Sequence, residues 1–299
     1  MRRVSEGVAL SVVLACTERE KRVLPASIAA VQRELSGLSG ELILVASPES
    51  SASISAIAAR TGARSVESAG FLVPELWRDG WRASLGDAVA FLIPECHVAP
   101  GWARALLREL EHGAGGAGGY FALDASATST DAAIYFLRYA SFSDAERITR
   151  DVVDIAGDNA IYRRDAMMPH AATFAGGFWE VDLHRRFRAE GVRLVLCGDA
   201  VAKFSGAPGL VAMSRQRLTH GRHFGAWRAS RGKRPAWITL ALAPAVPAVL
   251  VARIVRRVWS RRHERLRLLT ALPALSVLSC AWALGETIGA LAGPPVARA

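Results

Sequence analysis

Cysteine is sparse in this sequence, and its spacing argues against two common roles. The chain has four cysteines, Cys16, Cys96, Cys197 and Cys280, and no two of them form a C-x-x-C pair. Structural zinc sites and disulfide frameworks both need closer and more regular sets of cysteines. We therefore expect a reducing compartment and four small, buried hydrophobic side chains.

Phosphate-binding glycine motifs are also missing. No G-x-G-x-x-G follows a strand-like run and no Walker lysine is present, so we interpret the Gly/Ala stretch Gly113–Gly119 as a flexible connector. A secretory signal is not expected either, because the first apolar run, Val8–Ala15, has the length of a strand and lacks a cleavage context.

Acidic residues are nearly absent from one long basic segment. From Arg215 to Arg267 the chain is rich in arginine, and Glu264 is the single acid, whereas the whole chain carries a net charge of +10. Such a segment suits nucleic acid or an anionic membrane surface. Because it brackets apolar runs and lacks an aromatic platform, we expect a membrane and no nucleic-acid partner.

Runs of strand length and helix length alternate from the start of the chain. Half of all residues are apolar (51%), which is enough for a sizeable core. The alternation predicts an α/β fold with a doubly wound, mostly parallel sheet. Ligands bind such sheets at the carboxyl ends of the strands. The expected strands are Val8–Ala15, Glu41–Ala46, Ala88–Ile93 and Val192–Cys197, and the expected helices are Glu18–Leu35, one through Ile54 and Ala58, and Ala103–Leu110.

Four segments, read in order across residues 8–205, resemble the family-2 glycosyltransferases. They are Leu10–Leu14 with Thr17-Glu18-Arg19, Gly40–Val45, Gly157–Arg164, and Gly176–Leu183 continuing to Gly191. The resemblance implies a nucleotide-sugar-binding fold of the A type, a nucleotide-sugar donor and a divalent metal, Mg²⁺ or Mn²⁺. It also implies that an acidic helix start supplies the catalytic base.

The sequence departs from the family pattern at two places. The family places an aspartate just after its second strand, where this chain has Ala46 and Ser47. The family also ends its third strand with Asp-x-Asp, where this chain has Ile93-Pro94-Glu95. The first departure bears on which nucleotide is bound. The second bears on whether metal is bound in the way that is usual for the family.

The fourth segment supplies the candidate catalytic residues, Glu180 and Asp182. Inverting transfer needs a base that removes a proton from the acceptor hydroxyl, and Glu180 follows an aromatic residue, Trp179, that we assign to substrate binding. The alternative is that both acids merely stabilise a helix N-terminus, by about 0.3–1 kcal/mol.

Further candidates surround this base. Glu95 would bind the metal through oxygen, with His97 as a second ligand, unless both belong to an ordinary polar loop. Asp158 and Asn159 suit recognition of sugar hydroxyls, or the capping of a helix. The remaining substrate-binding candidates are Thr17, Glu18 and Ser47 near the nucleotide, and Arg217 and Arg222 near the diphosphate, although these arginines equally suit a membrane-facing helix.

We expect a catalytic domain over residues 1–232 and a membrane-associated helical region over 233–299. Trp237–Ala252 is short and holds two prolines, so we expect it to re-enter or to lie along the cytoplasmic leaflet. Leu268–Ala292 is long enough to cross, with the C-terminus outside.

The predicted enzyme thus transfers a sugar to a lipid or glycan acceptor at the cytoplasmic face of the inner membrane. The alternative is a non-catalytic protein of the same fold that binds nucleotide sugars or glycans.

Overall fold

The computed structural model describes residues 8–17, 22–143, 145, 147–175, 179–230 and 236–293. Their contacts form two compact units, one within residues 1–124 and 142–206 and the other within 125–141 and 207–299. The division differs from the predicted ranges 1–232 and 233–299. The physical reason is that helix α8 (Leu210–Ser230) packs along α11 (Arg265–Ala292) and so belongs to the helical unit.

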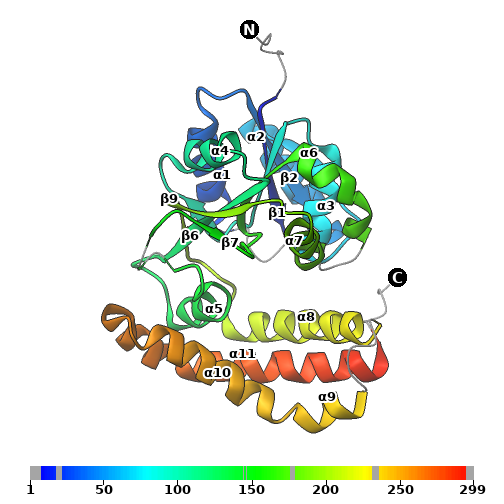
Figure 1. The fold of residues 1–299 in the computed structure, drawn as a ribbon, viewed down its shortest axis with the longest axis vertical. Helices are drawn as coiled ribbons and strands as arrows, with labels where there is room; N and C mark the ends of the chain where they lie inside the picture. The colour runs from blue at the N-terminus through cyan, green and yellow to red at the C-terminus, as the bar shows by residue number, and fades with distance from the viewer. Residues whose placement is uncertain are drawn as a thin grey trace. The chain divides into compact units, whose positions relative to one another are not determined.

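The first unit is built on a nine-stranded sheet (Figure 1) with the order β3-β2-β1-β4-β8-β6-β9-β5, in which β7 also pairs with β9. Strands β3, β2, β1 and β4 are mutually parallel, and antiparallel β8 joins them to the parallel pair of β6 and β9. The predicted α/β class is confirmed. The strands are β1 (Leu10–Cys16), β2 (Gly40–Ala46), β3 (Arg64–Glu67), β4 (Ala88–Leu92), β5 (Cys96–Val98), β6 (Gly116–Leu123), β7 (Arg150–Val152), β8 (Asn159–Arg163) and β9 (Leu194–Phe204).

Helices connect these strands, and those at Leu24–Leu35, Ser51–Thr61 and Trp102–Glu111 lie where the apolar spacing predicts them. The helix at Val73–Ala83 was not predicted from the sequence. Short 3₁₀ segments, Pro48–Ser50 and Met168–Ala175, precede α2 and α7. The α-helices of this unit are α1 (Leu24–Leu35), α2 (Ser51–Thr61), α3 (Val73–Ala83), α4 (Trp102–Glu111), α6 (Arg164–Met167) and α7 (Trp179–Ala189).

The interpretation of Gly113–Gly119 as a flexible connector is wrong, because Gly116–Leu123 is the buried strand β6. Its glycines allow close packing: a Cβ atom on Gly116 would lie 2.6 Å from the ring of Tyr162. The stretch therefore looked like a loop by composition, whereas neighbouring aromatic side chains require small residues there.

Helix α3 is amphipathic and lies directly on the sheet. Its apolar face buries Leu76, Trp77 and Trp81. A Cβ atom on Gly80 would lie 2.3 Å from Cγ1 of Val13, so only glycine lets the helix backbone approach β1 this closely.

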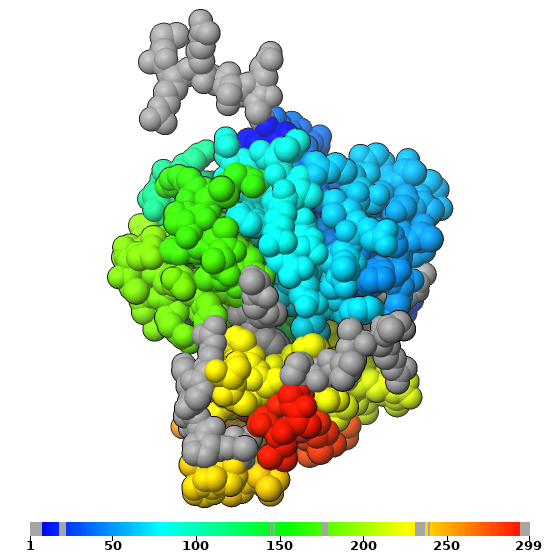
Figure 2. All heavy atoms as spheres, turned by 90° about the vertical axis from the view of Figure 1, so that its right-hand side faces the viewer, coloured from blue at the N-terminus to red at the C-terminus, as the bar shows by residue number. Residues whose placement is uncertain are grey.

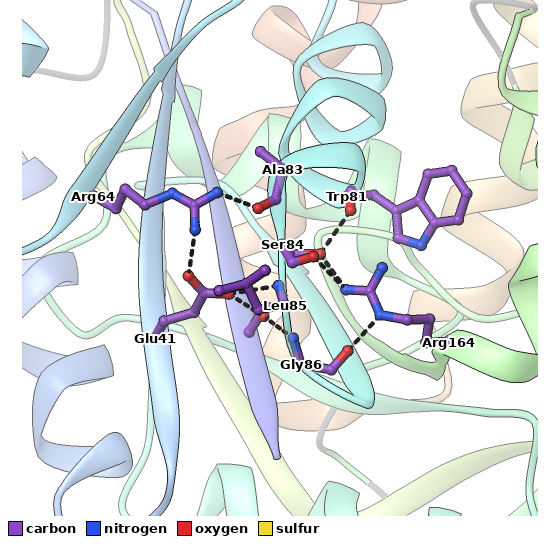
Figure 3. Close-up of polar contacts among 9 residues, drawn as sticks. Glu41, Arg64, Trp81, Ala83, Ser84, Leu85, Gly86 and Arg164 are labelled. Atoms are coloured by element: carbon purple, nitrogen blue, oxygen red, sulfur yellow. Dashed lines mark hydrogen bonds and ion pairs between the residues drawn. The ribbon is translucent and has the colours of Figure 1, made fainter. Parts of the chain in front are cut away.

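A polar network ties the amino ends of the parallel strands together (Figure 3). The Oε1 atom of Glu41 accepts hydrogen bonds from the Ser11 hydroxyl and the Leu85 amide, both at 2.7 Å. The Ser11 hydroxyl accepts from the Gly86 amide at 2.8 Å. Arg164 donates to the Gly86 carbonyl at 2.6 Å. The network is remote from the carboxyl ends of the strands, so we assign it a structural role.

The second unit is helical. Its elements are α5 (Ser129–Tyr139), α8, α9 (Ala236–Leu242), α10 (Ala245–Val258), a 3₁₀ turn at Arg262–Glu264, and α11. The predicted apolar run Trp237–Ala252 is divided between α9 and α10 near Pro244, which lacks the amide hydrogen that would continue the helix, whereas α11 accommodates Pro273 in its interior. Cys280 on α11 is exposed, in contrast to the other three cysteines, which are buried as expected.

Candidate functional site

The carboxyl ends of β1, β2 and β4 meet at one edge of the sheet. In the register of these strands Leu14 of β1 is opposite Leu44 of β2 and Leu92 of β4. Antiparallel β8 begins at this same edge, because its first residue, Asn159, is opposite Leu92. Residues that follow β1, β2 and β4 and residues that precede β8 are therefore neighbours, as the fold class predicts.

Glu180 lies at this edge, in the first turn of α7. A Cβ atom on Gly157 would lie 2.0 Å from Oε1 of Glu180, so the carboxylate is in contact with the backbone just before Asp158. The same Cβ atom would lie 2.9 Å from the ring of Trp77. The indole of Trp77 is held in place by its donation to the Leu92 carbonyl at 2.9 Å. A loop glycine and a fixed aromatic ring thus hold the candidate base.

Trp179 anchors α7 to the core. Its side chain is fully buried, and its indole donates to the Pro74 carbonyl at 2.8 Å. Its ring centroid lies 4.6 Å from that of Phe174 and 5.4 Å from that of Phe91. These contacts hold the Trp179 side chain in the core, where it positions the helix that carries Glu180.

A hydrogen-bonded chain of three side chains also connects α7 to the sheet. The Tyr162 hydroxyl and Nε2 of His184 are 2.8 Å apart, and Nδ1 of His184 is bonded to Asp154. Burial raises the pKa of Tyr162 well above its usual value, and the negative charges of Glu180 and Asp154 add to this effect. This chain was not identified from the sequence, because its members are distributed over β8, α7 and a loop.

The paired polar residues ahead of β8 differ in their surroundings. Asn159 is fully buried; its side-chain oxygen accepts from the Trp102 indole at 2.6 Å, and its amide donates to the Tyr120 carbonyl at 3.0 Å. Asp158 is 6% exposed and directly follows the glycine that contacts Glu180. The Asn159 side chain therefore makes hydrogen bonds inside the core. Asp158 is the member of the pair that lies beside the candidate base.

Asp182 lies two residues beyond the candidate base on α7. Its carboxylate pairs with Arg185, one helical turn later, at 3.4 Å. Such a pair suits the N-terminal turn of a helix, which was the alternative interpretation of the acids in this segment.

Glu95 and His97 lie beyond β4, but they do not form a complete metal site. Glu95 is buried, and its backbone carbonyl accepts from the Ser205 amide at 3.1 Å. His97 is opposite Lys203 in the pairing of β5 with β9, and burial lowers its pKa, with Asp124 opposing the shift. Among the described residues no three His, Cys, Asp or Glu side chains are grouped as metal ligands. Oxygen atoms of a bound diphosphate would have to supply the other ligands.

The nucleotide candidates follow β1 and β2. Thr17 is partly exposed directly after β1. Ser47 is buried after β2, with its hydroxyl 3.0 Å from that of Ser50, which in turn donates to the Cys16 carbonyl at 3.2 Å. Glu18 lies outside the described residues.

Arg217 and Arg222 both belong to α8 of the helical unit. The guanidinium of Arg217 lies over the ring of Trp282, 4.2 Å from its centroid. Burial, with Arg138 as a second cause, lowers the pKa of Arg217 to about 9, so it remains protonated at neutral pH. Arg222 donates to the Gly293 carbonyl at 3.1 Å. Both side chains thus have partners within the helical unit.

The chain shares its fold with solved glycosyltransferase structures. The mannosyltransferase PcManGT from Pyrobaculum calidifontis, solved with GDP-Man and Mn²⁺, is similar over 95% of this chain and 87% of its own, with a TM-score of 0.55 and 15% identity. GalNAc-T7, solved with UDP, GalNAc and Mn²⁺, is similar over 76% of this chain, with a TM-score of 0.53 and 10% identity. This chain spans about half (52%) of that second structure. The likenesses establish the A-type glycosyltransferase fold.

Sequence comparisons add nothing to this result. The sequence matches no protein-family model and no curated protein sequence.

Proposed function

We propose that this protein transfers a sugar from a nucleotide-sugar donor to an acceptor hydroxyl, with inversion and with Glu180 as the general base. The observation that carries the proposal is the position of the Glu180 carboxylate at the carboxyl edge of β4, in contact with Gly157. In an open α/β sheet this edge is where ligands bind. The A-type fold and the two solved structures that contain nucleotide or nucleotide sugar support the same substrate class.

The proposed reaction moves one proton to Glu180 and releases one leaving group, the nucleoside diphosphate. Glu180 accepts the proton of the acceptor hydroxyl, and the acceptor oxygen forms a bond to the anomeric carbon of the donor. The bond from that carbon to the diphosphate breaks, and the nucleoside diphosphate leaves. Attack from the face opposite to the leaving group inverts the anomeric centre. When bound, a divalent cation would neutralise the leaving diphosphate, and we assign Glu95 as the carboxylate that would bind it.

Substrate contacts are assigned by position along the carboxyl edge. Thr17 and Ser47 follow β1 and β2 and so suit the nucleotide. Asp158, beside the candidate base, suits the sugar hydroxyls.

We also propose that the acceptor is held at a membrane, as a lipid or a lipid-linked glycan, and that the sheet unit lies on the cytoplasmic side of the inner membrane. One helical stretch, Arg262–Ala292, is long and apolar enough to cross a bilayer by length and composition, and it is weak evidence of membrane association. The basic segment from Arg215 to Arg267 supports attachment to an anionic surface.

The test is donor hydrolysis and transfer by the detergent-purified protein across a panel of nucleotide sugars, with and without Mn²⁺. Glu180→Gln keeps the shape of the side chain and removes its basicity. It should preserve donor binding and reduce transfer at least about 100-fold. Glu111→Gln, at an exposed acid on α4, is the matched control and should transfer at the wild-type rate. Normal turnover by Glu180→Gln would eliminate this residue as the base.

A second candidate function is non-catalytic binding of nucleotide sugars or glycans on the same fold. It is favoured by Ala46, Ser47 and Ile93, which replace acids that the family uses for nucleotide and metal. The same panel distinguishes the two functions, because a binding protein would retain a donor without hydrolysing or transferring it.

A further inference from the structure

Helices α8 and α11 form a close parallel pair through four glycines. A Cβ atom on Gly225 would lie 2.0 Å from the Glu286 carbonyl oxygen, and one on Gly289 would lie 1.9 Å from the Arg222 carbonyl oxygen. Gly221 and Gly285 make similar contacts, with Trp282 and Leu218. Each helix therefore carries a small-x-x-x-small pair that brings the two backbones together. The contacting residue numbers rise together, so the helices run in the same direction.

This pairing fixes arginine side chains against the C-terminal half of α11. Arg217 covers the ring of Trp282, Arg222 donates to the Gly293 carbonyl, and Arg228 forms an ion pair with Glu286. If α11 crossed a bilayer, α8 would enter the hydrocarbon beside it. Each arginine at that depth costs at least about 2.5 kcal/mol on the most lenient scales. The geometry thus disfavours a crossing, although the length of α11 alone permits one.

The opposite side of α11 is exposed and uncharged. Leu284 and Leu291 are 55% and 56% exposed, and at 100° per residue they lie roughly 130° around the helix from the glycines that face α8. The exposed stripe consists of Leu266, Leu269, Pro273, Val277, Cys280, Leu284 and Leu291. We call it the α11 stripe.

A second exposed apolar surface lies on α9 and the first half of α10. Residues 236–252 contain no charged side chain. Trp237 is 69% exposed and Leu240 is 53% exposed. Near Leu242 and Val246 this segment lines a small cavity with Ala283 and Thr287 of α11, and the ion-paired Arg228 and Glu286 complete the lining. Figure 2 shows α9, in gold, and the end of α11, in red, at the surface of the helical unit.

Exposed arginines accompany these apolar surfaces. Arg253 and Arg256 follow the uncharged segment on α10, Arg262 lies in the 3₁₀ turn before α11, and Arg267 lies in the first turn of α11. The single acid of the basic segment, Glu264, is bonded to Arg261. Exposed tryptophans, Trp237 and Trp259, suit the level of lipid headgroups. An apolar face with cationic flanks is complementary to a bilayer with anionic headgroups.

We propose that α9, α10 and the α11 stripe insert into one leaflet of an anionic lipid bilayer, with α11 lying along the interface instead of crossing it. The inference deepens the membrane attachment in the proposed function. It is tested without any sugar substrate, so a failure of catalysis and a failure of lipid binding are separate results.

Cys280 provides the probe, because it lies in the α11 stripe while Cys16, Cys96 and Cys197 are buried. The full chain, carrying an environment-sensitive fluorophore on Cys280, is mixed with phosphatidylcholine vesicles with and without phosphatidylglycerol. The emission should shift to the blue with the anionic vesicles and be quenched by lipids brominated on the acyl chain. Equal binding to both vesicle types, or no quenching, would overturn the proposal. So would a blue shift that grows with protein concentration in the absence of lipid, because that indicates self-association.

Charge reversal tests the contribution of the exposed arginines to binding of the anionic bilayer. Arg253→Glu combined with Arg256→Glu should weaken binding to the anionic vesicles at least about tenfold, since each surface arginine contributes about 1 kcal/mol. The control is Arg60→Glu, at an exposed arginine on α2, which should bind like the wild type. An equal loss in both variants would contradict the assigned surface.

Topology is tested with one new exposed cysteine at a time, at Ser260, before α11, or at Ala292, at its end, in chains that carry Cys280→Ser and keep the three buried cysteines. An impermeant maleimide is applied to spheroplasts and to inverted membrane vesicles. Attachment to one leaflet predicts that both positions react from the same side. Reaction from opposite sides would show that α11 crosses and would refute the proposal.

Discussion

Gly157→Ala is a direct test of the site, because it adds one methyl group where the Glu180 carboxylate rests. The added Cβ would be 2.0 Å from Oε1 of Glu180, whereas ordinary contact begins near 3.4 Å. The end of the glutamate side chain must therefore move by roughly 1 Å or more, and a displacement of about 1 Å can cost a catalytic group a factor of about 100. We expect transfer to fall by about that factor while donor binding is largely retained.

The fold should survive this substitution. Gly157 does not have a positive φ, so alanine can adopt its backbone conformation. The carboxylate is the far end of a flexible side chain, and Trp77 is the second neighbour, at 2.9 Å. We expect a stability loss of no more than about 1–3 kcal/mol. Single-turnover transfer and urea unfolding measure the two effects, with Gly209→Ala, which meets no atom within 4 Å, as the control. A folded Gly157→Ala protein with an unchanged transfer rate would refute the placement of the base.

Three further substitutions test the proposed metal ligand Glu95, the stability of the fold at acidic pH, and the polar network at the amino ends of the parallel strands. Glu95→Ala should weaken nucleotide binding more with Mn²⁺ than without it, and equal losses in the two titrations would make Glu95 a structural residue. Burial alone would raise the pKa of Asp79, but hydrogen bonds from Arg78 and Ser68 outweigh it and lower that pKa. The stabilisation is therefore present at neutral pH and lost as the pH falls below the unfolded value of 3.8, so urea unfolding of Asp79→Asn should show a lower stability at pH 7 and a smaller change on acidification. Arg164→Met removes donors from the Gly86 carbonyl and from Ser84, and thermal unfolding should report a loss of about 1–3 kcal/mol with no change in donor binding.

The local pattern of the sequence was sufficient to predict strands β1, β2, β4 and the start of β9, and helices α1, α2 and α4, in the sheet unit. Val8–Ala15 was expected as a strand and β1 is Leu10–Cys16, and Glu41–Ala46 corresponds to β2. These predictions succeed because a strand buried on both faces needs apolar residues along its own length. The same reasoning failed at β6, where glycine is required by the ring of Tyr162 on another strand.

The candidate site was only partly visible in the sequence. The acidic start of α7 indicated Glu180, and the order of the strands indicated the edge where it would lie. The contacts of that carboxylate with Gly157 and Trp77, the use of Asn159 inside the core, and the link between His184 and Tyr162 depend on where distant segments meet.

The sequence by itself determined the alternation of strands and helices, the basic character of the chain after Arg215, and the lengths of the apolar runs. Those properties arise from neighbouring residues and can be read in order. Only the tertiary structure decided that Glu41 joins Ser11 to Leu85, and that the glycines of α8 meet those of α11. The physical reason is that such contacts depend on register and on helix packing, which bring together residues that are tens of positions apart in the chain.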